Sequence, residues 1–197
     1  MIERVMREAG LMPAQLGAVA AAIGPGGFTG IRVGLAAAHG IALAIGARLV
    51  GISSFAAVAA RLAGIGDGAC ETLLVALDSR RADLYVQLFA RDADSPLAAP
   101  QALLADQLGD YVARVAAGRG GRLLIAGDAA EAAAAALGGR VRCAVARGSA
   151  PDAQGVAAAA LAELCSGATA GPVRPFYLRP PDVTLPMRPQ PIPRGLP

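Results

Sequence analysis

Lysine is absent from the 197-residue sequence, so all 18 basic side chains are arginines. They exceed the 15 acidic side chains by three charges, an excess too small to indicate nucleic-acid binding on its own. The single histidine, His39, excludes a metal cluster built from several imidazoles. Cys70, Cys143 and Cys165 are an odd number without CxxC spacing, which fits neither a disulfide framework nor a zinc site. We therefore expect reduced thiols, a cytoplasmic location, and no bound metal or other cofactor.

Long hydrophobic runs that could enter a membrane are also lacking. The first ten residues carry charges throughout and do not predict a signal peptide. The apolar stretch 33–47 is shorter than a membrane span, contains His39, and is rich in alanine and glycine. With 55% hydrophobic residues the chain can fill a substantial core. We expect this stretch to be a buried helix and the protein to have no membrane contact.

The first part of the chain, residues 1–66, predicts alternating helices and strands. The expected elements are a helix ending near residue 9, a strand over 17–23, a long helix over 28–46, a strand over 48–53 and a helix to about 63. A strand, a helix and a second strand in this order indicate a parallel sheet. The glycine-rich break at 64–68 predicts a domain boundary.

The second part, residues 69–171, predicts another α/β domain. We expect a hairpin over 72–90, a helix over 101–117, strands over 122–127 and 141–146, and helices over 128–137 and 152–166. Nine of the fourteen prolines follow residue 171. Residues 172–197 are therefore expected to form an extended tail without a core of its own.

The stretch AAIGPGGFTGIRVG, residues 21–34, poses a choice between a phosphate site and a structural turn. A glycine turn before a helix can bind anions through free backbone N–H groups. A P-loop, however, needs Gly-Lys-Ser/Thr at the helix start, and here Ile31 and Arg32 follow Gly30. The dinucleotide pattern also fails, since Thr29 replaces its third glycine. The pattern favours a structural turn.

The helix after this turn is apolar on almost every face. One stripe contains Phe28, Ile31, Leu35, Ala38, Ala42 and Ile45, and a second contains Gly30, Gly34, Ala37, Ile41 and Ala44. A helix lying on one sheet needs a single apolar face, so the second predicts cover by another helix or another chain. Each glycine inside a helix costs about 1 kcal/mol relative to alanine, so Gly34 and Gly40 suit a close backbone approach. A helix enclosed within its own domain is the alternative.

Three segments together resemble the bacterial TsaB (YeaZ) family: GPGGFTGIRVGLAAAHGIALA, LLVALDSRRADLYVQLF and RPFYLR. The glycine motif of the family corresponds here to Gly24, Pro25, Gly26, Gly27, Phe28, Thr29, Gly30, Arg32 and Gly34. The resemblance covers residues 1 to about 180. It implies an α/β fold with two lobes, like actin, Hsp70 and sugar kinases (the ASKHA class of RNase H-like repeats).

The resemblance also implies a function. TsaB-like proteins are non-catalytic subunits that dimerise with a catalytic paralogue, TsaD, to make threonylcarbamoyladenosine at position 37 of tRNAs reading ANN codons. A TsaE-type ATPase and the tRNA are then partners through the complex. In the family the first two helices form the interface, and the corresponding candidates here are Ile2, Val5, Met6, Phe28, Ile31, Gly34, Leu35, Ala38, Ala42 and Ile45.

The sequence departs from the family at its start and in its chemistry. The family opens with a strand carrying Asp-Thr-Ser and two further strands, which have no counterpart here. We therefore expect an N-terminally truncated sequence, in which the strands over 17–23 and 48–53 lose sheet neighbours and expose apolar surface. The paired-histidine metal motif of the catalytic paralogue is absent, and the hairpin at 78–81 lacks the glycines that approach ATP in related folds.

Other readings stay open. The same fold could be an ATP-dependent transferase or kinase, or a glycopeptidase, and the apolar helix could pair with its own copy. His39 is expected to be structural, with a hydrogen bond or close packing. Asp78 and Asp83 are expected to cap a turn rather than act as paired catalytic carboxylates, and Arg80 and Arg81 to be solvated, with tRNA phosphate contact as the alternative. The tail arginines, which could dock on an acidic partner or simply be flexible, are Arg174, Arg179, Arg188 and Arg194.

Overall fold

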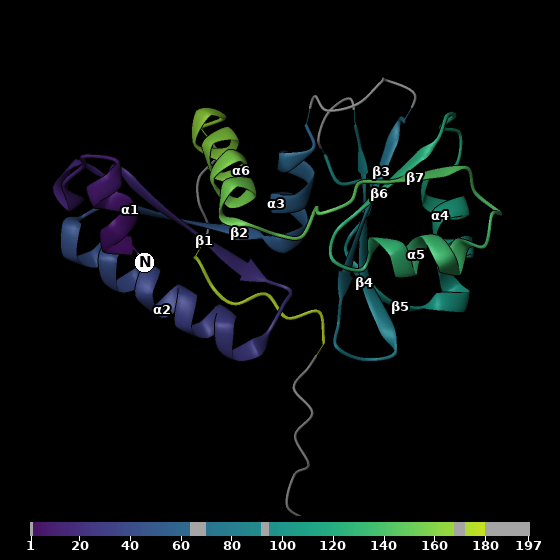
Figure 1. Cartoon of the computed structure of the whole chain (residues 1–197), viewed down its shortest axis with the longest axis horizontal. Coiled ribbons are helices and arrows are strands. Elements are labelled where there is room, and N and C mark those ends of the chain that lie inside the picture. Colours follow the sequence, from purple (N-terminus) through teal and green to yellow (C-terminus); the bar gives the residue numbers. More distant parts are fainter. Residues whose placement is uncertain (1, 64–69, 92–94, 168–171, 180–197) are drawn as a thin grey trace, which may run out of the picture.

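Two lobes lie side by side in the computed structural model, which describes residues 2–63, 70–91, 95–167 and 172–179 (Figure 1). The first lobe contains α1 (Ile2–Glu8), the 3-10 helix η1 (Pro13–Gln15), β1 (Ala18–Gly24), α2 (Phe28–Ile45), β2 (Arg48–Ser53) and α3 (Ser54–Arg61). These elements match the predicted ones closely. Ser53 ends β2 and caps α3, since its Oγ accepts a hydrogen bond from the Ala56 N–H at 3.0 Å.

The first lobe is built around a two-stranded parallel sheet. β1 and β2 pair in register from Ala18↔Arg48 to Ala22↔Ile52. α2 covers one face of this sheet, and α3 and α6 (Ala153–Cys165) lie on the other, where Val50 and Ile52 are buried (Figure 1). A right-handed crossover helix between parallel strands gives this layering.

The second lobe has a five-stranded sheet in the order β5-β4-β3-β6-β7. Its elements are β3 (Thr72–Asp78), β4 (Asp83–Ala90), β5 (Gln101–Leu104), the 3-10 helix η2 (Ala105–Gln107), α4 (Leu108–Val115), β6 (Leu123–Ala126), α5 (Ala130–Leu137) and β7 (Cys143–Val145). β3 pairs antiparallel with β4 and parallel with β6. One face packs on α4 and α5, and the other packs on α3, so α3 connects the two lobes.

The predicted helix over 101–117 is wrong at its start. Gln101–Leu104 form a strand that pairs antiparallel with β4, and the helix begins only at Leu108. Pairing with a distant strand overrides the local helical spacing of the leucines. The helix predicted from Asp128 begins at Ala130, and the Asp128 carboxylate accepts a hydrogen bond from the Asp78 N–H at 2.9 Å.

α6 follows the second lobe in sequence but packs on the first. Asp152 caps the helix, accepting a hydrogen bond from the Gly155 N–H at 2.7 Å. A Cβ at Gly155 would overlap the carbonyl of Ala57, so α6 and α3 touch backbone to backbone. The predicted division at residue 171 therefore groups α6 with elements on which it does not pack. The proposed boundary at 64–68 lies outside the described residues.

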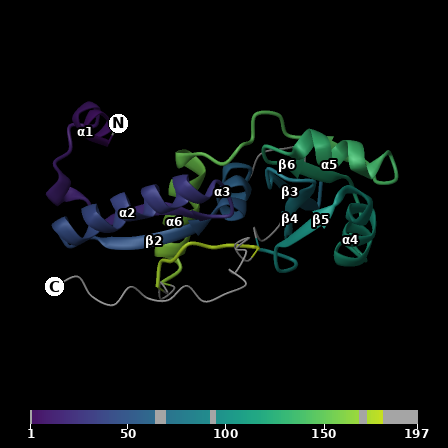
Figure 2. The same cartoon turned by 90° about the horizontal axis from the view of Figure 1, so that it is seen from below.

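Residues 172–179 form an extended strap along both lobes, seen in yellow-green in Figure 2. In the first lobe the Phe176 N–H donates to the Ile23 carbonyl at 2.8 Å, and Val173 lies against Gly51. Phe176 and Leu178 then pack on the second lobe's core. Residues 172–179 of the predicted tail are therefore extended and without a core of their own, and they pack on both lobes.

Candidate partner interface

The glycine turn between β1 and α2 is fixed by the strap. Gly24 has φ +116°, the Gly24–Pro25 peptide is cis, and a Cβ at Gly24 would lie 2.6 Å from the Phe176 carbonyl oxygen. Among the motif glycines described, Gly27, Gly30 and Gly34 have open space where a Cβ would be. Packing within the chain therefore explains Gly24 and leaves these three unexplained.

α2 buries one stripe and exposes the rest. Ile31, Leu35, Ala38 and Ala42 are buried within the chain, so their prediction as interface residues is wrong. Both predicted stripes are apolar, and periodicity cannot tell which one packs on the helix's own sheet. Phe28 and Gly34 are exposed and Ile45 is half-buried, so these three stay candidates.

The exposed part of α2 carries large apolar side chains. Val33 is 64% exposed and Leu43 86% exposed. The expectation of a buried helix over 33–47 is therefore wrong. Of the described helices, α2 is also the one long and apolar enough to cross a membrane, although an apolar helix with one face on a sheet and one face for a partner passes the same test.

The other candidate helix, α1, stands apart from α2 and the sheet in Figure 2. None of its residues is buried. The predicted interface residues Ile2 and Val5 are exposed, and Met6 is half-buried. α1 thus adds unpaired apolar side chains to the same lobe.

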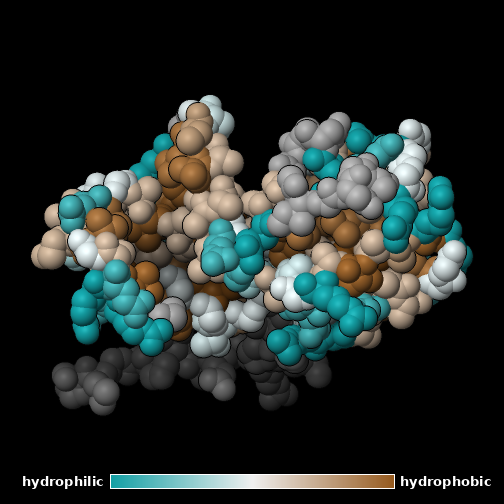
Figure 3. Space-filling view, turned by 45° about the horizontal axis from the view of Figure 1, so that its top comes forward, coloured by the Kyte–Doolittle hydropathy of each residue, from teal (hydrophilic) through white to brown (hydrophobic). Residues whose placement is uncertain are grey.

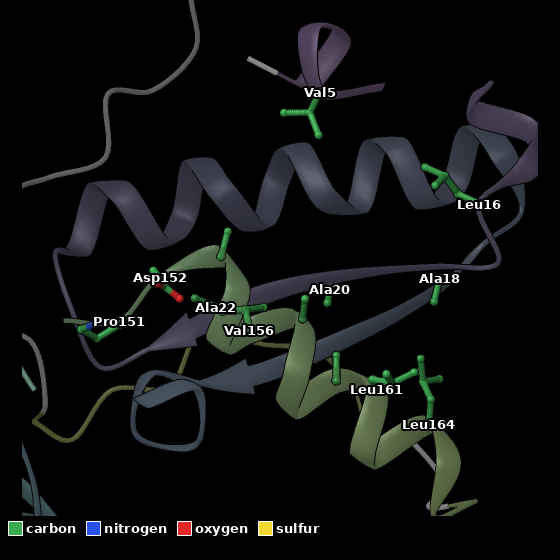
Figure 4. Close-up of a pocket in the computed structure, with 13 residues that line it drawn as sticks. Val5, Leu16, Ala18, Ala20, Ala22, Pro151, Asp152, Val156, Leu161 and Leu164 are labelled. Atoms are coloured by element: carbon green, nitrogen blue, oxygen red, sulfur yellow. The ribbon is translucent and has the colours of Figure 1, made fainter. Parts of the chain in front are cut away.

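An apolar groove of about 840 Å³ runs between β1, α1 and α6 (Figure 4). Ala18, Ala20 and Ala22 point into it from β1, and Leu161 and Leu164 from α6. In the described part of the chain β1 has only β2 as a sheet neighbour. The prediction of exposed apolar surface is confirmed for β1 but not for β2, where Val50 and Ile52 are buried. Figure 3 shows hydrophobic surface on and beside α6.

An aromatic and arginine cluster lies at the start of α2. The Arg32 guanidinium carbon is 3.7 Å from the Phe28 ring centroid and 5.8 Å from that of Tyr177. Arg32 Nε donates a hydrogen bond to Tyr177 Oη at 2.8 Å. The two rings stack with centroids 5.6 Å apart. The motif residue Arg32 is thus held in place by the strap residue Tyr177.

The hairpin of the second lobe holds a buried carboxylate that the sequence did not reveal. Asp78 caps the turn as predicted, accepting from the Arg80 N–H at 2.7 Å. Asp83 instead has a side chain 2% exposed, and its Oδ1 accepts from Ser79 Oγ at 3.0 Å. Its Oδ2, which accepts no hydrogen bond of good angular geometry, lies 2.7 Å from Arg179 Nη2. Arg179 therefore docks on its own chain. Arg174 is exposed, and Arg188 and Arg194 lie outside the described residues.

The remaining candidates behave as structural residues. His39 Nδ1 lies 2.9 Å from the Leu35 carbonyl oxygen, one turn earlier in α2, as expected for a hydrogen-bonded structural histidine. The three cysteines are free. Arg80 is 84% exposed and forms an ion pair with Asp78. The Arg81 N–H donates a hydrogen bond to Ser79 Oγ at 3.1 Å. Within the described ranges no group of three or more His, Cys, Asp and Glu side chains could hold a metal ion.

Comparison with known proteins shows which family the chain belongs to. The family model described as TsaD, tRNA N6-adenosine threonylcarbamoyltransferase, matches residues 1–114, more than half of the chain. The chain belongs to this family. Among curated proteins it is similar to two TsaB proteins. It is 32% identical over 92 residues to tRNA threonylcarbamoyladenosine biosynthesis protein TsaB of Escherichia coli, covering 47% of this chain and 39% of that protein. The TsaB of Haemophilus influenzae gives 33% over 92 residues, covering 47% and 38%.

A TsaD-named relative and two TsaB-like structures complete the comparison. The tRNA N6-adenosine threonylcarbamoyltransferase of Erythrobacter litoralis is 41% identical over 88 residues, covering 38% of this chain and 26% of that protein. The matches to these curated relatives thus span well under half of their length. YeaZ from Pseudomonas aeruginosa has a TM-score of 0.69 at 21% identity, covering 85% of this chain and 75% of that one. A Pseudomonas aeruginosa protein described as similar to peptidase YeaZ gives 0.73 at 22%, covering 91% and 81%. The actin-like fold of the TsaB family is therefore confirmed.

Proposed function

We propose that the chain is a non-catalytic subunit of the cytoplasmic machinery that makes threonylcarbamoyladenosine at position 37 of tRNAs reading ANN codons. Its role is to bind the TsaD-type catalytic paralogue through α2 and α1. The TsaE-type ATPase and the tRNA are then reached through that complex. The observation that carries the proposal is the exposed apolar surface of α2, with Leu43 86% and Val33 64% exposed.

The glycines of α2 support this assignment. Among the described residues no atom lies within 4 Å of a Cβ built at Gly34 or Gly40, so packing against them requires neither glycine. Each nevertheless weakens the helix by about 1 kcal/mol relative to alanine. A partner helix that approaches closely at either position gives that glycine a physical reason, as small residues do at tightly packed helix pairs.

Gly34→Leu tests the proposal in binding assays with the purified paralogue from the same organism. We expect the leucine to block close approach and abolish the complex, while the thermal transition of the isolated chain is retained. Gly109→Leu, in a second-lobe helix where a Cβ meets only Arg140 at 3.6 Å, is the matched control and should bind normally. Unchanged binding by Gly34→Leu contradicts the proposal.

A catalytic role is the second candidate, because the Erythrobacter relative named as a transferase is 41% identical to this chain over 88 residues. Under this reading the purified chain alone would turn over ATP or transfer a carbamoyl group, and substitution of Asp78 would abolish the reaction. Our proposal instead expects turnover only after the paralogue is added. Analytical ultracentrifugation of the chain alone tests the third reading, in which α2 pairs with its own copy.

A further inference from the structure

Arg32 is the only residue with a formal charge in α2, an 18-residue helix whose other polar side chains are Thr29 and His39. Its guanidinium group is held at three points: by the Phe28 ring, by the Tyr177 ring and by the hydrogen bond from Nε to Tyr177 Oη. Arginine normally loses much side-chain freedom when it binds a ligand. Here that freedom is already restricted in the free chain.

Arg32 is exposed, and within the part of the chain that the structure describes its two terminal nitrogens have no hydrogen-bond partner. Among the described residues no carboxylate lies within 4.0 Å of Arg32, whereas Arg4, Arg61, Arg147 and Arg179 each pair with one. Phe28 is 51% exposed and Tyr177 40% exposed, so the cluster reaches the surface. Exposed arginine and aromatic side chains that are rigid in the free protein are typical of the residues that dominate binding energy in protein interfaces.

The surroundings of Arg32 favour a carboxylate of a protein partner over a nucleic-acid phosphate. Binding to nucleic acid draws its affinity from several basic side chains together, and α2 offers one. Val33 and Leu43, exposed on the same helix, need an apolar counter-surface. A guanidinium fork presents parallel N–H groups that fit the two oxygens of a carboxylate.

We propose that Arg32, held over the Phe28 ring and hydrogen-bonded to Tyr177, anchors the protein partner at the α2 face by binding one of its carboxylate side chains. This rests on the proposed function, in which α2 meets the catalytic paralogue. It also gives the strap a role in binding, because Tyr177 reaches the cluster from residues 172–179.

Calorimetric titration of the full chain with the paralogue tests the anchor. Arg32→Met should weaken the dissociation constant by about 30-fold, as loss of a binding hot spot does. Arg32→Lys keeps the charge but loses the fork and the stacking, and should still be weaker by about 10-fold. Tyr177→Phe removes only the hydrogen bond and should cost about 3-fold. The control is Arg174→Met, an exposed arginine of the same strap, which should change binding by less than about twofold.

Charge reversal tests the carboxylate itself. Arg32→Glu should abolish binding, and replacing one acidic residue of the partner's surface by arginine should restore it. Absence of rescue across all exposed acidic residues of the partner, or an Arg32→Met dissociation constant within about threefold of wild type, would overturn the anchor. Loss of tRNA binding with intact paralogue binding would overturn it in favour of phosphate. If Gly34→Leu abolishes the complex while the Arg32 variants bind normally, the proposed function stands and the anchor falls; if Gly34→Leu also binds normally, the proposed function falls.

Discussion

Removing the strap's ion pair should destabilise the fold measurably. Arg179→Met leaves the Asp83 carboxylate buried with one hydrogen bond, from Ser79 Oγ at 3.0 Å. Breaking a fully buried ion pair costs about 3 to 5 kcal/mol. The Arg179 side chain is 40% exposed against 2% for Asp83, so it retains part of its hydration in the folded chain. We therefore expect a loss of about 2 to 3 kcal/mol, or roughly 5 to 10 °C in the unfolding temperature.

Urea unfolding followed by circular dichroism measures this loss, with Arg174→Met as control. Arg174 is an exposed arginine of the same strap, and its substitution should shift stability by less than about 0.5 kcal/mol. The double variant Asp83→Leu with Arg179→Met removes both charges and should regain most of the stability, since apolar replacement of a buried pair is close to neutral. The reasoning is refuted if Arg179→Met and Arg174→Met are equally stable, or if the double variant is the least stable.

Three further predictions use the same urea titration. Gly155→Ala should lower the free energy of unfolding by about 3 kcal/mol, because its Cβ overlaps the Ala57 carbonyl; an unchanged midpoint would contradict the contact between α3 and α6. Gly34→Ala should raise the free energy of unfolding by up to about 1 kcal/mol, because its Cβ meets open space. A lower free energy of unfolding would contradict the open space at this position. Burial raises the pKa of Tyr111 above its usual 10.0, so the unfolded chain ionises first and stability should fall above about pH 10, by up to about 1.4 kcal/mol per pH unit. Tyr111→Phe should remove that part of the fall. It should cost little at pH 8, since among the described residues no partner forms a hydrogen bond of good geometry with the buried hydroxyl; equal pH profiles would refute this.

The sequence predicted elements whose signals are local. β1, α2 and β2 followed from apolar runs on either side of the glycine turn, and α3 from the helical pattern that follows β2. The hairpin of β3 and β4 followed from alternating side chains. These features depend on neighbouring residues, so a single sequence is sufficient to find them.

Features that depend on distant contacts could not be predicted. The return of α6 to the first lobe depends on Gly155 meeting Ala57, and the buried pair joins Asp83 to Arg179 from the other end of the chain. No periodicity encodes such pairings. For the candidate interface, the sequence showed that α2 is apolar on two sides but not which side its own sheet covers. The prolines predicted that the strap is extended, but they did not predict which residues it contacts.

The strap contacts the turn that precedes α2 and then the hairpin that begins the second lobe's sheet. Folds of two lobes commonly open and close about a hinge when they bind a ligand. In this chain, rotation of one lobe against the other would have to break the Phe176 hydrogen bond, the Asp83 ion pair, or both. The molecule is therefore expected to move as a single rigid body, so that α2 is presented to a partner at a fixed angle to the rest of the chain.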